Sequence, residues 1–268
     1  MAQLLLRGKP LGDFEGVLFD KDGTLSHSEP RLIEQGHSRI EAVCECFIAQ
    51  QQHHEGNASE QMKLLKAQLR QAYGLSDATV SPDGLLAVAS RLHNLVATAT
   101  VLSLMGLAWP KALQLAEVSF RQAAEMRRAT QSPVNEQPSP LLPGAGAILD
   151  QLQAAGMTCA VISNDTKAGI SAFLQAHRLA SHMAGIWSAD DQPCKPNPAA
   201  VEQLCAQLNL QPSRCVLIGD ADSDLLMARQ AGVGLCLGYT AGWANAPSLC
   251  EHQQLIGHWN ELQVATGA

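Results

Sequence analysis

The sequence predicts an α/β protein in which a Rossmann-like parallel sheet, flanked by helices, carries an inserted all-α domain. After residue 143, short apolar runs alternate with amphipathic segments, which is typical of a parallel sheet with a helix in each connection. Residues 26 to about 130 show only helical periodicity, and they directly follow the first apolar run. We therefore expect a core of residues 1–25 and 141–268 and a helical cap of residues 26–140.

The first predicted strand, residues 15–20, contains a continuous apolar run, as expected of a strand buried on both faces. The motif Asp20-Lys21-Asp22-Gly23-Thr24 follows it, so two carboxylates lie one residue apart where the chain turns. Open α/β sheets place their chemistry at this edge. Asp20 and Asp22 are therefore candidates to attack an electrophile and to move a proton.

Four segments of the insert repeat apolar residues at helical spacing. Since each apolar stripe needs a partner to cover it, four antiparallel helices packed together are predicted. Gly74 is a natural end for the second helix, and Pro110 suits the first turn of the fourth. The stripes are Ile33, Ile40, Cys44 and Phe47; Met62, Leu65, Leu69 and Tyr73; Leu85, Ala89, Leu92, Val96 and Ala99; and Leu113, Ala116, Phe120 and Ala123.

The second half of the core follows a proline-rich linker at residues 132–143. The alternation of predicted strands and helices there ends with a strand at residues 233–237. The other predicted strands are 158–163, 185–187 and 215–219, and the predicted helices are 144–155, 167–177, 198–208 and 223–231.

Composition excludes several classes of protein. The 268 residues are 46% apolar and 16% charged, which argues against a disordered chain. A net charge of −7 without a Lys/Arg cluster argues against a nucleic-acid binder, and no apolar stretch predicts a membrane span. The eight cysteines include no C-x-x-C pair, so we expect reduced, mostly buried thiols in a cytoplasmic protein.

Three further polar groups accompany the later predicted strands: Ser163-Asn164-Asp165, Lys195-Pro196 and Gly219-Asp220-x-x-x-Asp224. Because the carboxyl ends of parallel strands share one edge of the sheet, residues 20, 163, 195 and 220 are expected to converge. Several carboxylates this close repel one another, and a hard divalent cation such as Mg²⁺ removes the conflict. A lysine, a hydroxyl and helix N–H groups beside them suit a phosphate, so the set predicts phosphoryl transfer.

These motifs, in this order and with a long helical insert between the first two, resemble those of the haloacid-dehalogenase-like (HAD) hydrolase superfamily. The insert resembles a type-1 cap, and the chain looks like the phosphoglycolate-phosphatase-like subgroup. The resemblance implies hydrolysis in two steps, in which Asp20 forms an aspartyl-phosphate and Asp22 protonates the leaving alcohol and then assists water. It implies that Asp20, the main-chain oxygen of Asp22, and Asp220 hold Mg²⁺, with Asp224 in support. Ser163, the backbone of Asn164, and Lys195 are implied to bind the phosphate.

Other residues near the motifs have simpler interpretations. Asp165 and Asp222 are interpreted as capping or solvated groups, because an Asp beside a helix start commonly has that role. Lys21 replaces the apolar residue that is commonest at its position in the family, and it is expected to face the cap or solvent. His53 and His54 diverge on a helix, so we interpret them as solvated and not as a metal pair.

The resemblance also suggests the substrate and the alternatives. It implies a small phosphorylated metabolite, with phosphoglycolate first and sugar phosphates next, and no nucleic-acid or membrane partner; the oligomeric state stays open. Arg31, Arg91 and His93 are candidates to reach the substrate. A sugar-phosphate mutase and a non-catalytic binding protein remain alternatives. A dehalogenase is disfavoured by Asp22 and the metal carboxylates, and a phosphonatase by the lack of a recognisable cap lysine.

Overall fold

The computed structural model describes residues 2–50, 58–130 and 138–265. The chain divides into two compact units, one of Met1–Ser28 with Pro138–Ala268 and one of Glu29–Gln137. We call them the core unit and the helical unit, and we describe each by itself. The paired histidines His53 and His54 lie outside the described residues.

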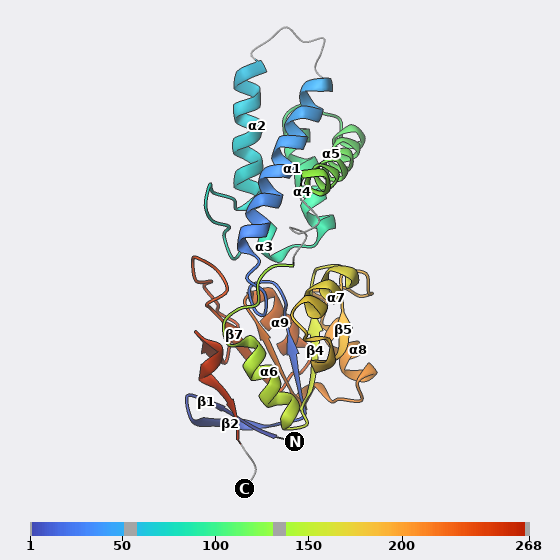
Figure 1. The fold of residues 1–268 in the computed structure, drawn as a ribbon. Helices are drawn as coiled ribbons and strands as arrows, with labels where there is room; N and C mark the ends of the chain where they lie inside the picture. The colour runs from blue at the N-terminus through green and yellow to red at the C-terminus, as the bar shows by residue number, and fades with distance from the viewer. Residues whose placement is uncertain (1, 51–57, 131–137, 266–268) are drawn as a thin grey trace. The chain divides into compact units, whose positions relative to one another are not determined.

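The core unit is built on a six-stranded parallel sheet of order β5-β4-β3-β6-β7-β8 (Figure 1). Phe19 of β3 is paired with Val161 of β4 and with Ile218 of β6, so these three strands end at the same level. Helices flank the sheet, which confirms the predicted α/β fold. The main elements are β3 (Gly16–Phe19), β4 (Thr158–Ile162), β5 (Met183–Trp187), β6 (Cys215–Gly219), α6 (Ala145–Ala154), α7 (Lys167–Ala176), α8 (Pro198–Gln207) and α9 (Asp222–Gln230).

The ends of the core unit differ from the prediction. β1 (Ala2–Leu6) and β2 (Lys9–Phe14) form an antiparallel hairpin, and β9 (Leu262–Val264) pairs with β1 to complete a second sheet. The predicted last strand is β7 (Leu235–Tyr239), and β8 (Gln254–Ile256) and β9 follow it. Strands of three residues carry too little alternation to be detected, because they are defined by their pairing and not by a local pattern.

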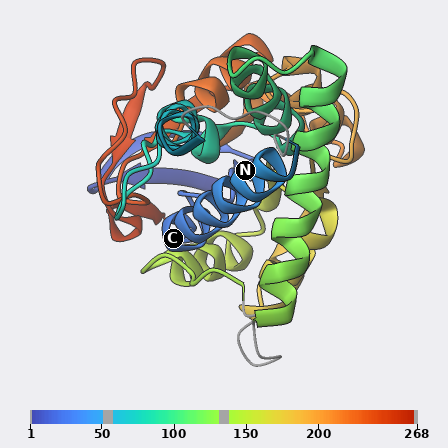
Figure 2. The same cartoon turned by 90° about the horizontal axis from the view of Figure 1, so that it is seen from above.

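In its described residues, 29–50 and 58–130, the helical unit contains four long helices and one single-turn helix. α1 packs against α2 and α5, and α4 packs against α2 and α5; Figure 2 shows α2 end-on beside α1. Within the described residues, no helix has both the length and the apolar character needed to cross a membrane. The helices are α1 (Glu29–Gln50), α2 (Ala58–Tyr73), α3 (Leu85–Val88), α4 (Arg91–Leu104) and α5 (Trp109–Thr130).

The predicted third helix is in fact two helices. α3 ends at Val88, and Ser90 takes an extended conformation and caps α4 by accepting a hydrogen bond from the His93 N–H. The break changes the register of the expected stripe, so Leu92 is 65% exposed and Val96 is 40% exposed, although Ala99 of the same stripe is buried. A Ser side chain can cap a new helix, so it favours starting α4 over continuing α3. The spacing of apolar residues does not reveal such a break.

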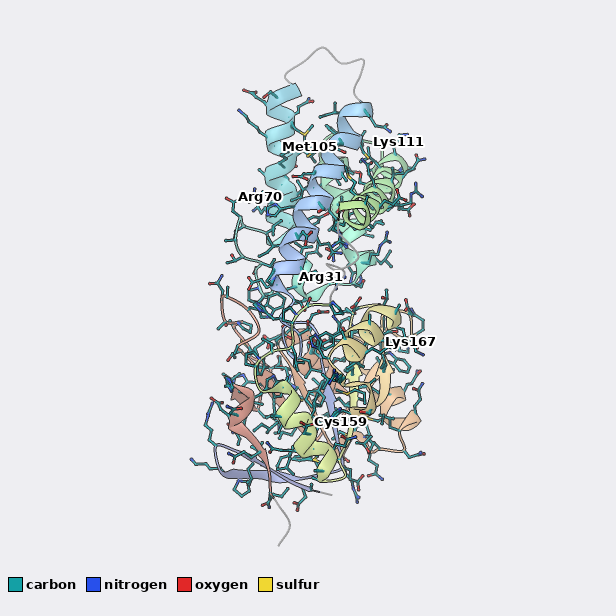
Figure 3. All side chains as sticks on the ribbon, viewed as in Figure 1. Arg31, Arg70, Met105, Lys111, Cys159 and Lys167 are labelled. Atoms are coloured by element: carbon teal, nitrogen blue, oxygen red, sulfur yellow. The ribbon has the colours of Figure 1, made fainter. Side chains whose placement is uncertain are left out.

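The cysteines are free thiols, as the sequence predicts. Cys159 on β4 is one of the buried cysteines (Figure 3). The buried cysteines are Cys44, Cys159, Cys205, Cys215 and Cys236.

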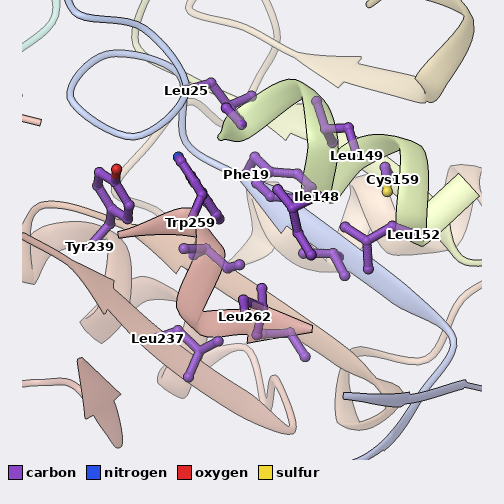
Figure 4. Close-up of a cluster of buried hydrophobic side chains, with 14 of the residues drawn as sticks. Phe19, Leu25, Ile148, Leu149, Leu152, Cys159, Leu237, Tyr239, Trp259 and Leu262 are labelled. Carbon is purple, nitrogen blue, oxygen red and sulfur yellow. The ribbon is translucent and has the colours of Figure 1, made fainter. Parts of the chain in front are cut away.

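Alternate side chains of the central strands pack into the two faces of the sheet. Val17 and Phe19 of β3 belong to the cluster that α6 and α7 cover, together with Trp259 (Figure 4). Leu18 points to the opposite face, where α8 and α9 pack. Because β3 is buried on both faces, the position of its carboxyl end is fixed by packing. The residue that follows, Asp20, is therefore presented from a rigid element.

Candidate active site

Three carboxylates converge beyond the carboxyl ends of β3 and β6. Asp20 follows β3, Asp220 follows β6, and Asp224 lies in the first turn of α9. One carboxylate oxygen of each residue lies within 4.8 Å of those of the other two, and the three residues are 6%, 3% and 5% exposed. The structure therefore brings together three acidic residues, of which Asp20 and Asp224 are 204 positions apart along the chain.

Lys195 lies among these carboxylates. Its Nζ is 2.6 Å from Oδ1 of Asp20 and 2.7 Å from Oδ1 of Asp224, and it also donates to the main-chain oxygen of Ile162 at 3.3 Å. Burial lowers the pKa of Lys195, but the two carboxylates outweigh burial and raise it above its ordinary value. Lys195 is therefore a permanent positive charge next to the predicted nucleophile.

The electrostatics of the cluster fit a cation. Burial raises the pKa of Asp20 to about 6 against the attraction of Lys195, and the carboxylates of Asp224 and Asp22 add to the rise. Burial and the charges of Asp20 and Asp224 raise the pKa of Asp220 well above its ordinary value. A single ammonium group thus leaves excess negative charge, and an oxygen-only donor set of this kind suits a hard divalent cation such as Mg²⁺. Asp20, Asp220 and Asp224 are the residues that could hold it.

Asp220 is oriented by two hydrogen bonds. Thr24 Oγ1 donates to its Oδ1, and the indole Nε1–H of Trp243 donates to its Oδ2, both at 2.6 Å. Trp243, 7% exposed, was missed by the sequence analysis. Its position four residues beyond β7, at the same edge of the sheet as the motifs, is a signal that could have found it.

Only glycine fits at position 23, because the backbone there lies close to the side chain of Asp220. Its φ is +79°, and a Cβ there would collide with the carboxylate of Asp220 and with the Trp243 indole. Gly242 lies so close to the main-chain carbonyl of Gly23 that a Cβ at residue 242 would also collide. The turn after β3 and the loop after β7 are therefore packed backbone against backbone, which is possible only with glycine at both positions.

Asp22 belongs to a second charged network. Its Oδ1 accepts hydrogen bonds from Lys21 Nζ at 2.6 Å and from the Ser28 hydroxyl. Lys21 also lies 3.2 Å from the carboxylate of Asp165, and its Nζ is 5.7 Å from the centre of the Phe173 ring.

The expectation that Lys21 faces solvent is wrong, because the side chain is buried at 6% exposure. Burial lowers its pKa, but Asp22 and Asp165 outweigh burial and raise it. Asp165 is therefore an ion-pair partner as well as a turn residue whose Oδ1 accepts from the Thr166 N–H.

The predicted phosphate-binding residues follow β4. Ser163 is 2% exposed, and its Oγ accepts a hydrogen bond from the N–H of Asp165 at 3.2 Å. Asn164 is partly exposed in the same turn. Ile162, whose carbonyl accepts from Lys195, directly precedes this turn, so the turn adjoins the carboxylate cluster.

Asp222 has a structural role. Its Oδ1 accepts from the backbone N–H groups of Cys250 at 2.8 Å and Glu251 at 3.0 Å. It therefore holds the loop before β8 while remaining partly exposed, and it is not the N-cap of α9, which is Ala221.

Comparison with known proteins places this fold and site in a family. A model of the haloacid dehalogenase-like hydrolases matches residues 14–232. Phosphoglycolate phosphatase of Vibrio vulnificus (strain CMCP6) is 33% identical over 108 residues, which are 39% of this chain and 47% of that protein. Phosphoglycolate phosphatase of Yersinia pseudotuberculosis is 32% identical over 136 residues, 49% of this chain and 58% of that protein. The chain thus spans about half the length of these relatives.

A solved structure shows the same fold over nearly the whole chain. The crystal structure of a predicted phosphoglycolate phosphatase from Haemophilus somnus 129pt aligns with a TM-score of 0.60 at 18% identity, covering 93% of this chain and 96% of that one. The family model extends over most of the residues that carry the sheet and the site. The chain therefore belongs to the haloacid dehalogenase-like hydrolase family.

Proposed function

We propose that this chain is a Mg²⁺-dependent phosphatase that hydrolyses small phosphate monoesters through an aspartyl-phosphate on Asp20. The observation that carries the proposal is the buried cluster of Asp20, Asp220 and Asp224 around Lys195. A carboxylate nucleophile, a fixed ammonium and a cation-binding set are the parts that phosphoryl transfer requires.

In the first step, a carboxylate oxygen of Asp20 attacks phosphorus, and the bond from phosphorus to the ester oxygen breaks. Asp22 donates a proton to the departing oxygen, which leaves as a neutral alcohol. Lys195, the Ser163 hydroxyl and the Asn164 backbone bind the phosphoryl oxygens. Lys21 and Ser28 hold the carboxylate of Asp22, which fixes the direction from which the proton arrives.

In the second step, Asp22 accepts a proton from water as the water oxygen attacks phosphorus. The bond from phosphorus to Asp20 breaks, and inorganic phosphate is released with the nucleophile restored. Asp20, the main-chain oxygen of Asp22, and Asp220 would hold Mg²⁺, and Asp224 would support them. The cation, when bound, neutralises negative charge that develops on the phosphoryl group.

The names of the relatives support a choice of substrates to test. Both curated relatives are named phosphoglycolate phosphatases, so phosphoglycolate is the first substrate to test, and sugar phosphates are the next. The partner is in either case a small phosphorylated metabolite and not a nucleic acid.

The test is phosphate release from a panel of small esters with Mg²⁺, with chelator, and with Mg²⁺ restored. Activity should disappear in chelator and return with Mg²⁺, and Asp20→Asn should lose it. Exposed Asp190→Asn is the matched control and should keep it. Wild-type turnover in Asp20→Asn would show that the nucleophile is misassigned.

Phosphorus NMR of the products separates the alternatives. A phosphatase releases inorganic phosphate, whereas a sugar-phosphate mutase returns the phosphoryl group to a sugar. A non-catalytic binding protein would bind an ester in the presence of Mg²⁺ without changing it.

A further inference from the structure

One face of α4 exposes a row of apolar side chains. Leu92, Val96 and Leu104 are 65%, 40% and 72% exposed. Thr100, which is also exposed, lies between the last two, so the four residues follow one another at intervals of four. Side chains spaced in this way are neighbours on one face of a helix, where they form a ridge. We call these four residues the α4 ridge.

The ridge is not used in the packing of α4 within its own unit. Leu95, Ala99 and Leu102 lie on the buried face of the helix, and α4 packs against α2 and α5. An isolated exposed leucine needs no explanation, whereas a contiguous apolar patch is typical of a surface that another molecule covers.

The surroundings of the ridge carry very little charge. Residues 94–110 contain no Asp, Glu, Lys, Arg or His, and residues 84–116 contain no acidic residue, although the chain has 25. By contrast, the exposed Leu64 of α2 lies one turn from Glu60 and next to Lys63. Like charges that face each other oppose association, so in a protein of net charge −7 this face allows a second copy to approach without such repulsion.

The ridge is complementary to itself when two copies of α4 run antiparallel. With Val96 of one copy opposite Thr100 of the other, Leu92 lies opposite Leu104, and all four positions are paired. An antiparallel register shifted by one helical turn in either direction leaves a leucine outside the pairing. Ridges with a spacing of four residues pack against each other in the commonest class of helix contact. The paired surface is the same on both copies, as a two-fold dimer requires.

The centre of the ridge can be covered without leaving a polar group unpaired. Thr100 Oγ1 donates a hydrogen bond to the main-chain oxygen of Val96 at 2.9 Å, within the same helix. The hydroxyl therefore has a partner of its own, and the methyl group of Thr100 can pack against a second helix. Covering this residue does not incur the cost of an unsatisfied buried hydroxyl.

The two ends of α4 favour the antiparallel direction. The helix has no acidic residue in its first turn, which begins with Arg91, and no basic residue in its last turn. The partial positive charge at its N-terminus and the partial negative charge at its C-terminus are therefore not offset by side chains of those turns. An antiparallel copy brings opposite ends together, whereas a parallel copy brings like ends together.

The size of the ridge limits the strength of the contact. From Leu92 to Leu104 the helix rises about 18 Å, and a helix is about 10 Å wide. A strip of these dimensions is smaller than the roughly 800 Å² per partner of a standard interface. We propose that a second copy of this chain covers the α4 ridge, in an antiparallel two-fold dimer whose Kd lies in the micromolar range. The dimer does not depend on the proposed phosphatase activity.

The proposal is tested first by the oligomeric state in solution. Sedimentation velocity of the full chain is measured over micromolar to submillimolar concentrations. The weight-average mass should rise from that of one chain toward that of two as the concentration increases. A chain that stays monomeric over this range would overturn the proposal.

Two variants that change the net charge in opposite directions distinguish the ridge from general electrostatics. Leu92→Glu and Leu104→Lys should each raise the Kd about tenfold or more, because each places an unpaired charge against a leucine. Leu64→Glu is the matched control, with the same change at a leucine of α2 that is 52% exposed, and it should keep the wild-type Kd. All three side chains are exposed, so the fold should persist, which thermal unfolding checks. A folded Leu92→Glu or Leu104→Lys protein with the wild-type Kd would contradict the interface.

Mixing Leu92→Glu with Leu104→Lys tests the register. In a mixed dimer, the introduced carboxylate of one chain faces the introduced ammonium of the other, and the second contact keeps its two leucines. The equimolar mixture should therefore dimerise with a Kd about tenfold or more below that of either variant alone. A mixture that dimerises no better than its components would rule out the antiparallel pairing of Leu92 with Leu104.

Discussion

The indole N–H of Trp243 donates a hydrogen bond to Oδ2 of Asp220 at 2.6 Å. Trp243 lies in the loop after β7, and Asp220 follows β6, so the contact joins two neighbouring strand ends. It leaves the remaining lone pairs of Asp220 to face Asp20 and Asp224, whose carboxylates lie within 4.8 Å. Groups that orient metal ligands in this way commonly change metal affinity when they are removed.

Trp243→Phe removes the N–H and keeps most of the ring. We expect Mg²⁺ affinity, measured by calorimetry, to fall roughly 10- to 100-fold. The matched control is Trp187→Phe, which removes the buried indole N–H that donates to the carbonyl of Pro193 at 2.9 Å. Equal losses in the two variants would mean that Trp243 acts only on general stability.

Gly23→Ala tests the close packing of the turn after β3. The new Cβ would collide with Asp220 and Trp243, so we expect loss of Mg²⁺ binding in addition to a strain of about 1 kcal/mol. Gly156→Ala has a similar positive φ of +71° but open space around the new Cβ. Gly156→Ala should therefore lose stability in a denaturant titration but bind Mg²⁺ unchanged. A Gly23→Ala protein that binds Mg²⁺ normally would refute the packing argument.

Lys21→Met tests whether the hydrogen bond from Lys21 positions the carboxylate of Asp22. Without Lys21 Nζ, the Asp22 carboxylate loses a charged hydrogen bond, so we expect kcat to fall about tenfold or more with little change in Mg²⁺ affinity. Lys21→Arg should restore part of kcat, and Lys167→Met, at an exposed position, should leave it intact. A Lys21→Met enzyme with wild-type kcat would remove Lys21 from the mechanism.

The pH dependence of stability follows from Asp20. Its pKa rises from 3.8 to about 6 in the folded protein, so folding favours the protonated form. In chelator this group's contribution is complete below pH 3.8, and it is lost as the pH rises toward 6, a loss on the order of 3 kcal/mol. Bound Mg²⁺ favours the ionised form, so the thermal shift that Mg²⁺ produces should be larger at pH 7 than at pH 5. An equal shift at both values would contradict the coupling.

The sequence revealed those parts of the fold and site that depend on local pattern. β3, β4 and β6 are continuous apolar runs, and each is followed by polar residues at a turn, so Asp20, Ser163 and Asp220 could be placed at one edge of the sheet. The break at Ser90 could not be read from apolar spacing, because a helix cap changes the register without changing the composition.

The remaining features depend on contacts between distant residues. Lys21 is buried because Asp165 and Phe173, far along the chain, surround it. Trp243 matters because its loop packs on Gly23, and Arg39 of α1 is buried because Asn94 and Phe120 hold it among helices. Trp243 and Arg39 lie in no recognisable motif, and the motif that contains Lys21 does not reveal its distant partners, so only the folded chain shows these contacts.

The most direct test of the account is chemical trapping of the phosphoryl group on Asp20. The enzyme is mixed with phosphoglycolate and Mg²⁺ and quenched with borohydride, which reduces an acyl phosphate to an alcohol, and the modified residue is located by peptide mass spectrometry. The account predicts homoserine at position 20, dependent on both substrate and Mg²⁺ and more abundant in Asp22→Ala. Reduction at another residue, or phosphate release with Asp20 never modified, would contradict it.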